Sequence, residues 1–315
     1  MLARQSLAHQ VALSDPTVGR GTTALRMTEA TGEVPTGGSG LGRQLVGLAL
    51  ATHLGPTLVV TGATTALAAA AGRGSGTMWV ALAVLAGQCS VGWSNDAIDA
   101  DRDRRVGRTS KPIVAGLVTE RTVALASVAA FVCCIPLSLA SGWRAATVHM
   151  VAVMAAIAYN LGLKSTILSP LPYAISFGLL PAFVTLGLPE GGWPRPIVMV
   201  ATSLIGVGAH FINAVADASD DAVTGIKGLP QRLGPRRALE VGTIVLLVST
   251  TIVALLAPHR RPALAAALCV VAVDLGVVAS GAHGRHRLAW RLALLGGVGC
   301  LAVFVIGGDA LVRVR

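Results

Sequence analysis

Charged residues are scarce in this sequence, at 13% of 315 residues, and aromatic residues make up only 4%. Apolar residues make up 53%, and the mean hydropathy is +0.70. This composition excludes a disordered chain, a collagen-like chain and an ordinary water-soluble domain. It is typical of a polytopic membrane protein, in which the 37 glycines let helices approach closely.

Cysteine is rare as well, and all five cysteines stand inside segments that we expect to be helical. A free thiol there behaves as a small apolar residue, so the sequence predicts neither a disulfide nor a cysteine-based metal site. Residues 1–42 are polar and lack an apolar core of signal-peptide type. We expect them to form a disordered cytoplasmic tail before a membrane domain at 43–315.

Nine apolar segments are long enough to cross a membrane, which predicts an all-α protein with nine transmembrane helices. They lie at about 45–71, 78–95, 120–141, 143–162, 170–188, 197–216, 239–257, 262–282 and 288–308. If the amino end is cytoplasmic, 18 of the 25 basic residues fall on the inner side. The positive-inside rule therefore favours a cytoplasmic amino terminus and an external carboxyl terminus, in a bacterial-type inner membrane. The net charge of +10 then requires no nucleic acid.

Acidic residues number only 15, and seven of them stand in two short windows. The windows read Asn95-Asp96-Ala-Ile-Asp99-Ala-Asp101-Arg-Asp103 and Asn213-Ala-Val-Ala-Asp217-Ala-Ser-Asp220-Asp221. In each, an asparagine and two aspartates recur every four residues and so share one side of a helix. Carboxylates at this spacing repel each other unless a cation lies between them, and oxygen ligands favour a hard metal such as Mg²⁺. The predicted metal ligands are Asn95, Asp99, Asp103, Asn213, Asp217 and Asp221.

The two windows are also copies of each other at a constant offset of 118 residues. The matched pairs include Asn95 and Asn213, Asp99 and Asp217, Gly107 and Gly225, Pro112 and Pro230, and Gly116 and Gly234. This predicts two four-helix pseudo-repeats plus a ninth helix around a central cavity, into which both acidic stripes face. Basic residues follow each stripe, either as ordinary inner-loop charges or as ligands of a phosphate. The implied substrate is a diphosphate with a lipid tail.

These motifs resemble those of a known family. Asn95, Asp96, Asp99 and Asp103 complete an NDxxDxxxD motif, which resembles the first motif of the UbiA superfamily of intramembrane prenyltransferases. The segment KPIVAG at 111–116 is similar to the family's (R/K)PI-x-(S/A)G. Asp217 and Asp221 match its second motif, DxxxD, and 225–234 is similar to G-x-K-T-L-P-x-R-L-G, with Gly228 replacing the usual threonine.

The resemblance implies two Mg²⁺ ions, for which Mn²⁺ is the expected substitute, and a prenyl diphosphate substrate. It assigns catalytic roles to Asp99, Asp217, Lys164 and Tyr159. It assigns the diphosphate to Arg102, Lys111, Lys227 and Asp96. Asp96 lies about 100 degrees around the helix from its stripe, so we expect it to orient a base such as Arg102 or Lys111.

The implied reaction is transfer of the prenyl group to an aromatic or lipid-soluble acceptor with release of pyrophosphate. A terpene cyclase of the UbiA type is the alternative, and the few aromatic residues mildly favour transfer. Polar residues inside helices are candidates for acceptor recognition or, alternatively, for interhelical hydrogen bonds: His53, His149, His210 and Asp274. A transporter is disfavoured because the acids stand at inner helix ends. We expect no nucleic acid and no obligate protein partner.

Overall fold

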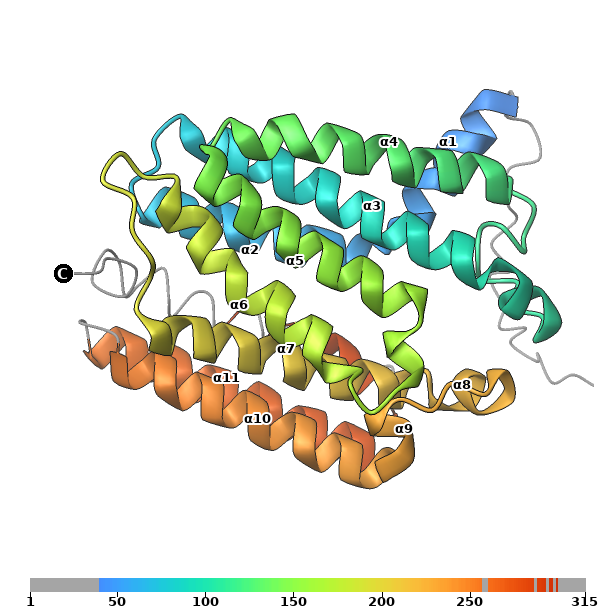
Figure 1. Cartoon of the computed structure of the whole chain (residues 1–315). Helices are drawn as coiled ribbons and strands as arrows, with labels where there is room; N and C mark the ends of the chain where they lie inside the picture. Colours follow the sequence, from blue (N-terminus) through green and yellow to red (C-terminus); the bar gives the residue numbers. More distant parts are fainter. Residues whose placement is uncertain (1–39, 257–259, 286–287, 293–294, 297–298, 300–315) are drawn as a thin grey trace, which may run out of the picture. The chain divides into compact units, whose positions relative to one another are not determined.

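The structure is a computed structural model that describes residues 40–256, 260–285, 288–292, 295–296 and 299 (Figure 1). Helices form the regular structure of these residues, with no strand among them. The helices are α1 (Gly40–Ala51), α2 (Leu54–Ala70), α3 (Gly76–Arg105), α4 (Glu120–Leu139), α5 (Trp143–Leu161), α6 (Pro170–Leu186), α7 (Pro196–Ala216), α8 (Ala218–Thr224), α9 (Leu229–Leu233), α10 (Pro235–Leu256) and α11 (Arg260–Ala282), with a 3₁₀ turn η1 (Leu163–Ser165) after α5.

Five helices, α3, α4, α5, α7 and α10, are long and apolar enough to span a membrane, and α1 with α2 forms a sixth, bent span. The prediction of an all-α membrane protein is confirmed. Each of the eight segments predicted between 45 and 282 contains a helix. The ninth, 288–308, lies mostly outside the described residues, as does nearly all of the predicted tail at 1–42. The tail therefore stays a prediction.

The first predicted span is broken, so the expectation of one continuous helix over 45–71 was wrong. α1 and α2 meet at 65°, and His53 between them has φ 58 and ψ 60. The cause is Pro56, which has no N–H to donate to the carbonyl of Thr52 and whose ring crowds it. That carbonyl accepts from the Thr57 hydroxyl instead, at 2.7 Å. His53 is the one residue other than glycine with positive φ in the described chain, a conformation that costs about 1–2 kcal/mol.

The break is held in place by close contact with α3. An added Cβ at Gly92 would lie 2.6 Å from the carbonyl oxygen of Thr52, so only glycine lets the two backbones approach this closely. The carbonyl of Leu48, four residues before Thr52, accepts from the indole nitrogen of Trp93 at 2.8 Å. These contacts set the first span against the stretch of α3 that carries the first acidic motif.

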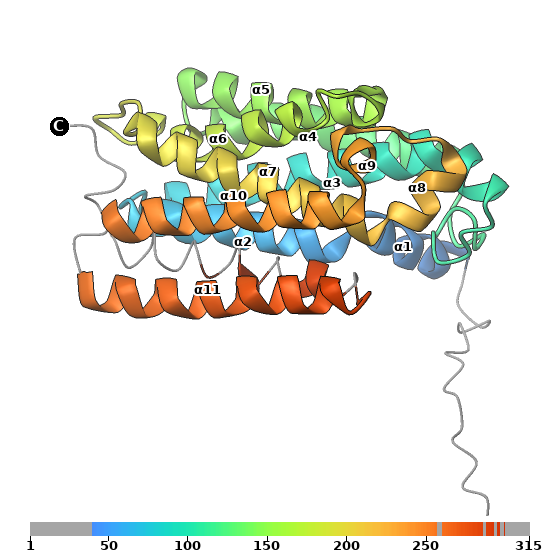
Figure 2. The same cartoon turned by 90° about the horizontal axis from the view of Figure 1, so that it is seen from below.

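Consecutive helices lie side by side: α2 with α3, α3 with α4, α5 with α6, α6 with α7, α7 with α10, and α10 with α11. Both views show the carboxyl end of α3 at the same end of the helical assembly as α8 and α9 (Figures 1 and 2). The sequence expectation placed both acidic windows at inner helix ends, and the fold brings those ends to one side.

The matched loop glycines share a positive φ as well as their spacing. Gly107 and Gly225 have φ of 66° and 74°, and Gly116 and Gly234 have φ of 69° and 82°. All four lie in the left-handed region, which favours glycine. Each acidic motif is therefore followed, at matched positions, by two residues whose backbone favours glycine, which supports equivalent places for α3 and α7.

Candidate functional site

A cavity of about 760 Å³ opens between the helices that carry the two acidic motifs. The structure brings together on its wall all the predicted site residues except Lys227. They are Asn95, Asp96, Asp99, Arg102, Asp103, Lys111, Tyr159, Lys164, Asn213, Asp217 and Asp221. Polar residues from windows that are 118 positions apart thus face one space.

The first motif lies wholly on α3, which continues ten residues beyond the predicted end of its span. Its central acid, Asp99, receives both hydrogen bonds of the Lys164 ammonium, at 2.5 and 2.7 Å. Arg102 adds a guanidinium nitrogen at 3.1 Å from the same carboxylate. Burial lowers the pKa of Lys164 and the neighbouring Asp99 opposes that shift. The buried ammonium and the carboxylate therefore stabilise each other.

The second motif crosses a junction, so the expectation that it lies on one uninterrupted helix needs correction. α7 ends at Ala216, Asp217 has φ −98 and ψ 3, and α8 begins at Ala218. The backbone bonds from Asp217 to Asn213 and from Asp221 to Asp217 nevertheless continue, at 3.2 and 2.9 Å. The four-residue spacing thus keeps its helical sense across the junction. Asn213, Asp217 and Asp221 all line the cavity.

Asp221 is the buried acid of this second motif. Its carboxylate accepts from Nε2 of Gln231 at 2.7 Å. Burial raises the pKa of Asp221 to about 6, and the nearby charge of Asp217 adds to the rise. A raised pKa in a carboxylate that faces a cavity is characteristic of functional sites.

Arg108 joins the two motifs. Its Nη1 lies 3.5 Å from Oδ1 of Asp103, and its Nη2 lies 3.5 Å from Oδ1 of Asp217. A single guanidinium therefore reaches acids of both windows, which places the windows within the span of one small anion and its cations. Sequence reasoning treated Arg108 only as one of the basic residues that follow the first stripe, because nothing along the chain indicates that it contacts α7.

Asp96 lies off the metal stripe, and its partners come from two other segments. Its Oδ1 accepts from the Lys111 ammonium at 2.6 Å and lies 2.8 Å from Nε2 of His53. Lys111 and His53 are themselves 3.3 Å apart. Asp96 is 2% exposed, and its Oδ2 has no partner among the described residues. The carboxylate thus orients Lys111 and His53 at the edge of the cavity.

Asn160 is a site residue that sequence reasoning missed. Its Nδ2 donates to the carbonyl of Val91 and to the Ser94 hydroxyl, at 2.9 and 2.8 Å, and its Oδ1 accepts from Asn95 at 3.3 Å. It lines the cavity and is 3% exposed. The sequence did contain a signal, since the asparagine directly after Tyr159 is a polar residue at the end of a long apolar stretch, 150–158.

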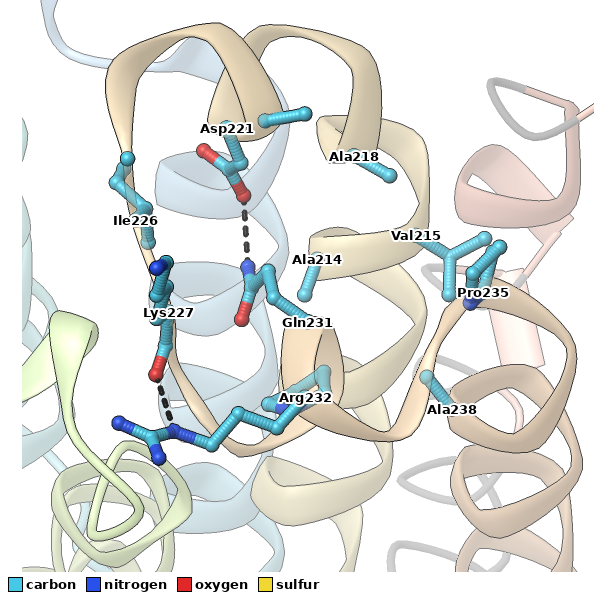
Figure 3. A pocket seen from close by; sticks show the side chains of 13 residues that line it. Ala214, Val215, Ala218, Asp221, Ile226, Lys227, Gln231, Arg232, Pro235 and Ala238 are labelled. Carbon is cyan, nitrogen blue, oxygen red and sulfur yellow. Dashed lines mark hydrogen bonds between the residues drawn. The ribbon is translucent and has the colours of Figure 1, made fainter.

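Lys227 lies elsewhere, on a second cavity of about 390 Å³ (Figure 3). Its side chain is exposed, and its carbonyl accepts from Nε of Arg232 at 2.7 Å. Asp221 and Gln231 line both cavities, so their hydrogen bond belongs to the shared wall. Lys227 is not in the set of residues that face the acidic motifs.

The other polar residues proposed for acceptor recognition differ in whether they line the large cavity. His53 lines the large cavity. His149 and His210 do not, and they form interhelical hydrogen bonds with Ser138 at 2.8 Å and Ser169 at 3.0 Å. Asp274 is buried in α11, with neither oxygen paired within the described part of the chain.

An aromatic wall extends the cavity away from the acids. The rings of Tyr159 and Tyr173 meet edge to face at 5.2 Å between centroids, and those of Tyr173 and Phe177 are stacked at 6.3 Å. All three residues line the cavity. Aromatic faces stabilise cations through their quadrupole, so this wall suits a developing carbocation.

The donor set fits Mg²⁺. Carboxylates and side-chain amides from two windows line one cavity, and these are the oxygen ligands that Mg²⁺ prefers. The Asn95 bonds to Asp99 and Asn160 both use Nδ2, so they leave the metal-binding oxygen of Asn95 unused. Among the described residues no three Asp, Glu, His or Cys side chains converge on one point. The basic side chains of the protein, from Lys164, Arg102 and Arg108, contact the acids of the first motif.

Solved structures of similar fold include two UbiA homologues and a synthase. The apo UbiA homologue from Aeropyrum pernix K1 has a TM-score of 0.64 at 20% identity, covering 79% of this chain and 97% of that one. The UbiA homologue from Archaeoglobus fulgidus bound to GPP and Mg²⁺ has a TM-score of 0.55 at 17% identity, covering 84% and 100%. A digeranylgeranylglyceryl phosphate synthase has a TM-score of 0.58 at 15% identity, covering 84% and 98%.

A search of curated protein sequences found no match. The sequence pattern of the family described as "UbiA prenyltransferase family" matches residues 46–298, about four fifths of the chain. This range holds both acidic motifs, Lys164 and the aromatic wall. The chain is therefore a member of the UbiA prenyltransferase family, and its multi-pass helical domain is the membrane-embedded fold of that family.

Proposed function

We propose that the protein is a Mg²⁺-dependent intramembrane prenyltransferase that transfers the prenyl group of a prenyl diphosphate to a lipid-soluble, commonly aromatic, acceptor and releases pyrophosphate. The observation that carries the proposal is the meeting of the two acidic motifs at one cavity, with Arg108 in contact with both. The Archaeoglobus fulgidus homologue bound to GPP and Mg²⁺ supports the choice of substrate and metal.

Two Mg²⁺ ions are proposed to bind among Asn95, Asp99, Asp103, Asn213, Asp217 and Asp221. When bound, the ions neutralise the charge that develops on departing pyrophosphate. The chain supplies further positive charge from Lys164, Arg102 and Lys111, which all line the cavity. Because cations surround the diphosphate end, cleavage of the allylic C–O bond is favoured there.

The apolar end of the cavity has a separate task. Tyr159, Tyr173 and Phe177 present aromatic surface next to the charged end. This surface excludes water and stabilises the allylic cation until an electron-rich acceptor forms the new bond. If the amino terminus is cytoplasmic, as the positive-inside rule predicts, the charged end lies at the cytosolic side, where a diphosphate is soluble.

The test is metal-dependent release of pyrophosphate by purified protein in detergent. We expect release from prenyl diphosphates of 10, 15 or 20 carbons with Mg²⁺ or Mn²⁺ and none with EDTA. Asp99→Ala and Asp217→Ala should each lower the rate by about 100-fold or more. Asp101→Ala is the matched control, since Asp101 is 77% exposed and pairs with Arg104 instead. Wild-type turnover in Asp99→Ala and Asp217→Ala would reject the proposed mechanism.

The aromatic wall also favours one alternative, a UbiA-type terpene cyclase, in which a distant double bond of the same prenyl chain attacks the cation. Mass spectrometry of products separates the two. A cyclic hydrocarbon or alcohol formed without added membrane extract indicates the cyclase. A prenylated product that requires the extract indicates transfer.

A further inference from the structure

We propose that His53 is the base that removes the proton lost when the prenyl cation is captured. The inference rests on the proposed function, because the proton must come from an acceptor or from a cyclised prenyl chain. It extends that function by assigning the last step of the reaction to a residue that belongs to neither acidic motif.

The first observation is where His53 stands. It occupies the break between α1 and α2, where its φ of 58 and ψ of 60 lie in the left-handed region. Glycine or asparagine would meet this conformation at a lower cost. A residue held in a disfavoured conformation on the wall of a cavity points to a use for its side chain. Its side chain is 39% exposed and lines the large cavity.

The second observation is how the ring is held. Nε2 lies 2.8 Å from Oδ1 of Asp96, and that oxygen also accepts from Lys111 at 2.6 Å. With Asp96 ionised and Lys111 protonated, the consistent tautomer has Nε2–H donating to Asp96. Nδ1 then carries the lone pair, and no partner contacts it among the described residues. A carboxylate behind an imidazole orients the ring and fixes its tautomer, as in other acid–base dyads.

The third observation is the position of His53 relative to the charged end of the cavity. Lys111 contacts Asp96 and lies 3.3 Å from His53, and it is a proposed ligand of the diphosphate. His53 thus lies beside a residue proposed to hold the leaving group, on the same cavity as the aromatic wall. A base at this place can reach a proton near the new bond while Lys111 keeps its own contact with the departing anion.

The proton and electron balance is simple. The allylic C–O bond breaks and its electron pair leaves with pyrophosphate. An electron pair of the acceptor, or of a distant double bond, forms the new bond to the prenyl carbon. The adjacent C–H or O–H pair returns to the product, and the proton passes to Nδ1 of His53. The imidazolium then loses this proton to water or to the departing pyrophosphate.

The test measures pyrophosphate and organic products in the same reaction, with labelled geranyl diphosphate, Mg²⁺ and a membrane lipid extract. In wild type we expect mainly the products of proton loss, whether a prenylated compound or a cyclic olefin. His53→Asn tolerates the backbone conformation and keeps an N–H donor toward Asp96, but it supplies no base. His53→Gly adopts the backbone conformation without strain and supplies neither an N–H donor toward Asp96 nor a base. His283→Asn, at an exposed histidine, is the control.

We expect the yield of proton-loss product per pyrophosphate to fall by about 100-fold in both His53 variants. Water then captures the cation and its extra proton passes to a second water molecule, so prenyl alcohol should accumulate. An unchanged yield per pyrophosphate would overturn the inference, as would parallel loss of pyrophosphate and product, which a merely structural histidine would cause. No metal-dependent pyrophosphate release by wild type would instead reject the proposed function itself.

Discussion

The ammonium of Lys164 contacts both carboxylate oxygens of Asp99, at 2.5 and 2.7 Å, although the two residues are 65 positions apart in the chain. Lys164 comes from the turn η1 after α5, and Asp99 lies near the carboxyl end of α3. This contact places a buried positive charge beside the acid in the middle of the first motif. A diphosphate that enters the cavity would meet both.

Replacement of Lys164 tests its role. Lys164→Met keeps the length of the side chain but removes the charge, so we expect the rate of pyrophosphate release to fall by about 100-fold or more. Lys164→Arg keeps the charge and should lose distinctly less, because a guanidinium still reaches the carboxylate. Steady-state kinetics with Mg²⁺ measures both variants. Equal losses in the two would show that charge at this position is unimportant.

Arg108 should contribute most to the free energy of unfolding when no metal is bound. Arg108→Ala leaves Asp103 and Asp217 without their shared guanidinium, and we expect the unfolding free energy in EDTA to fall by about 1 kcal/mol, because Asp217 is partly exposed. Added Mg²⁺ should recover most of the loss, since it supplies the missing positive charge. Thermal unfolding with EDTA and with Mg²⁺ measures this. Arg105→Ala, at an exposed arginine, is the control and should show neither effect.

The affinity for metal should depend on pH through Asp221. Burial raises the pKa of Asp221 to about 6, so the carboxylate gains its proton as pH falls through this value. A metal ligand must be deprotonated, so the affinity should weaken below about pH 6, by up to tenfold for each further pH unit. Above this pH it should level off. Mn²⁺ binding followed by electron paramagnetic resonance measures the profile.

Asp221→Asn is the matched variant for that profile. It should bind Mn²⁺ more weakly at pH 7.5, and the step in affinity near pH 6 should be absent. If the step persists in Asp221→Asn, another group causes it and the assignment to Asp221 is wrong.

The contact between α3 and the break in the first span can be tested with glycine replacements. Gly92→Ala would place a Cβ 2.6 Å from the carbonyl oxygen of Thr52, so the backbones must separate. We expect a loss of about 1–3 kcal/mol in unfolding free energy. Gly62→Ala, in α2, meets no atom within 4 Å and should be neutral or slightly stabilising. Comparable losses in both would contradict the proposed close approach.

Sequence patterns by themselves predicted the all-α membrane architecture, the positions of eight helical segments, the two acidic motifs and the internal repeat. Hydropathy and a four-residue spacing are properties of neighbours on one helix, so they can be read without knowing the fold. The matched glycines also carried structural information, because a left-handed turn favours glycine wherever it occurs. The break at His53 had a signal in Pro56, although hydropathy alone predicted one continuous helix.

Only the tertiary structure decided which base meets which acid. Lys164 with Asp99, Arg108 with Asp103 and Asp217, and Gln231 with Asp221 are contacts between segments that approach through helix packing and loop path. Spacing along the chain carries no information on such contacts. Lys227 shows the same limit, since it lies in the loop that motif similarity indicated but lines the smaller cavity. The direction of a loop side chain depends on the packing around it, and that is a property of the folded protein.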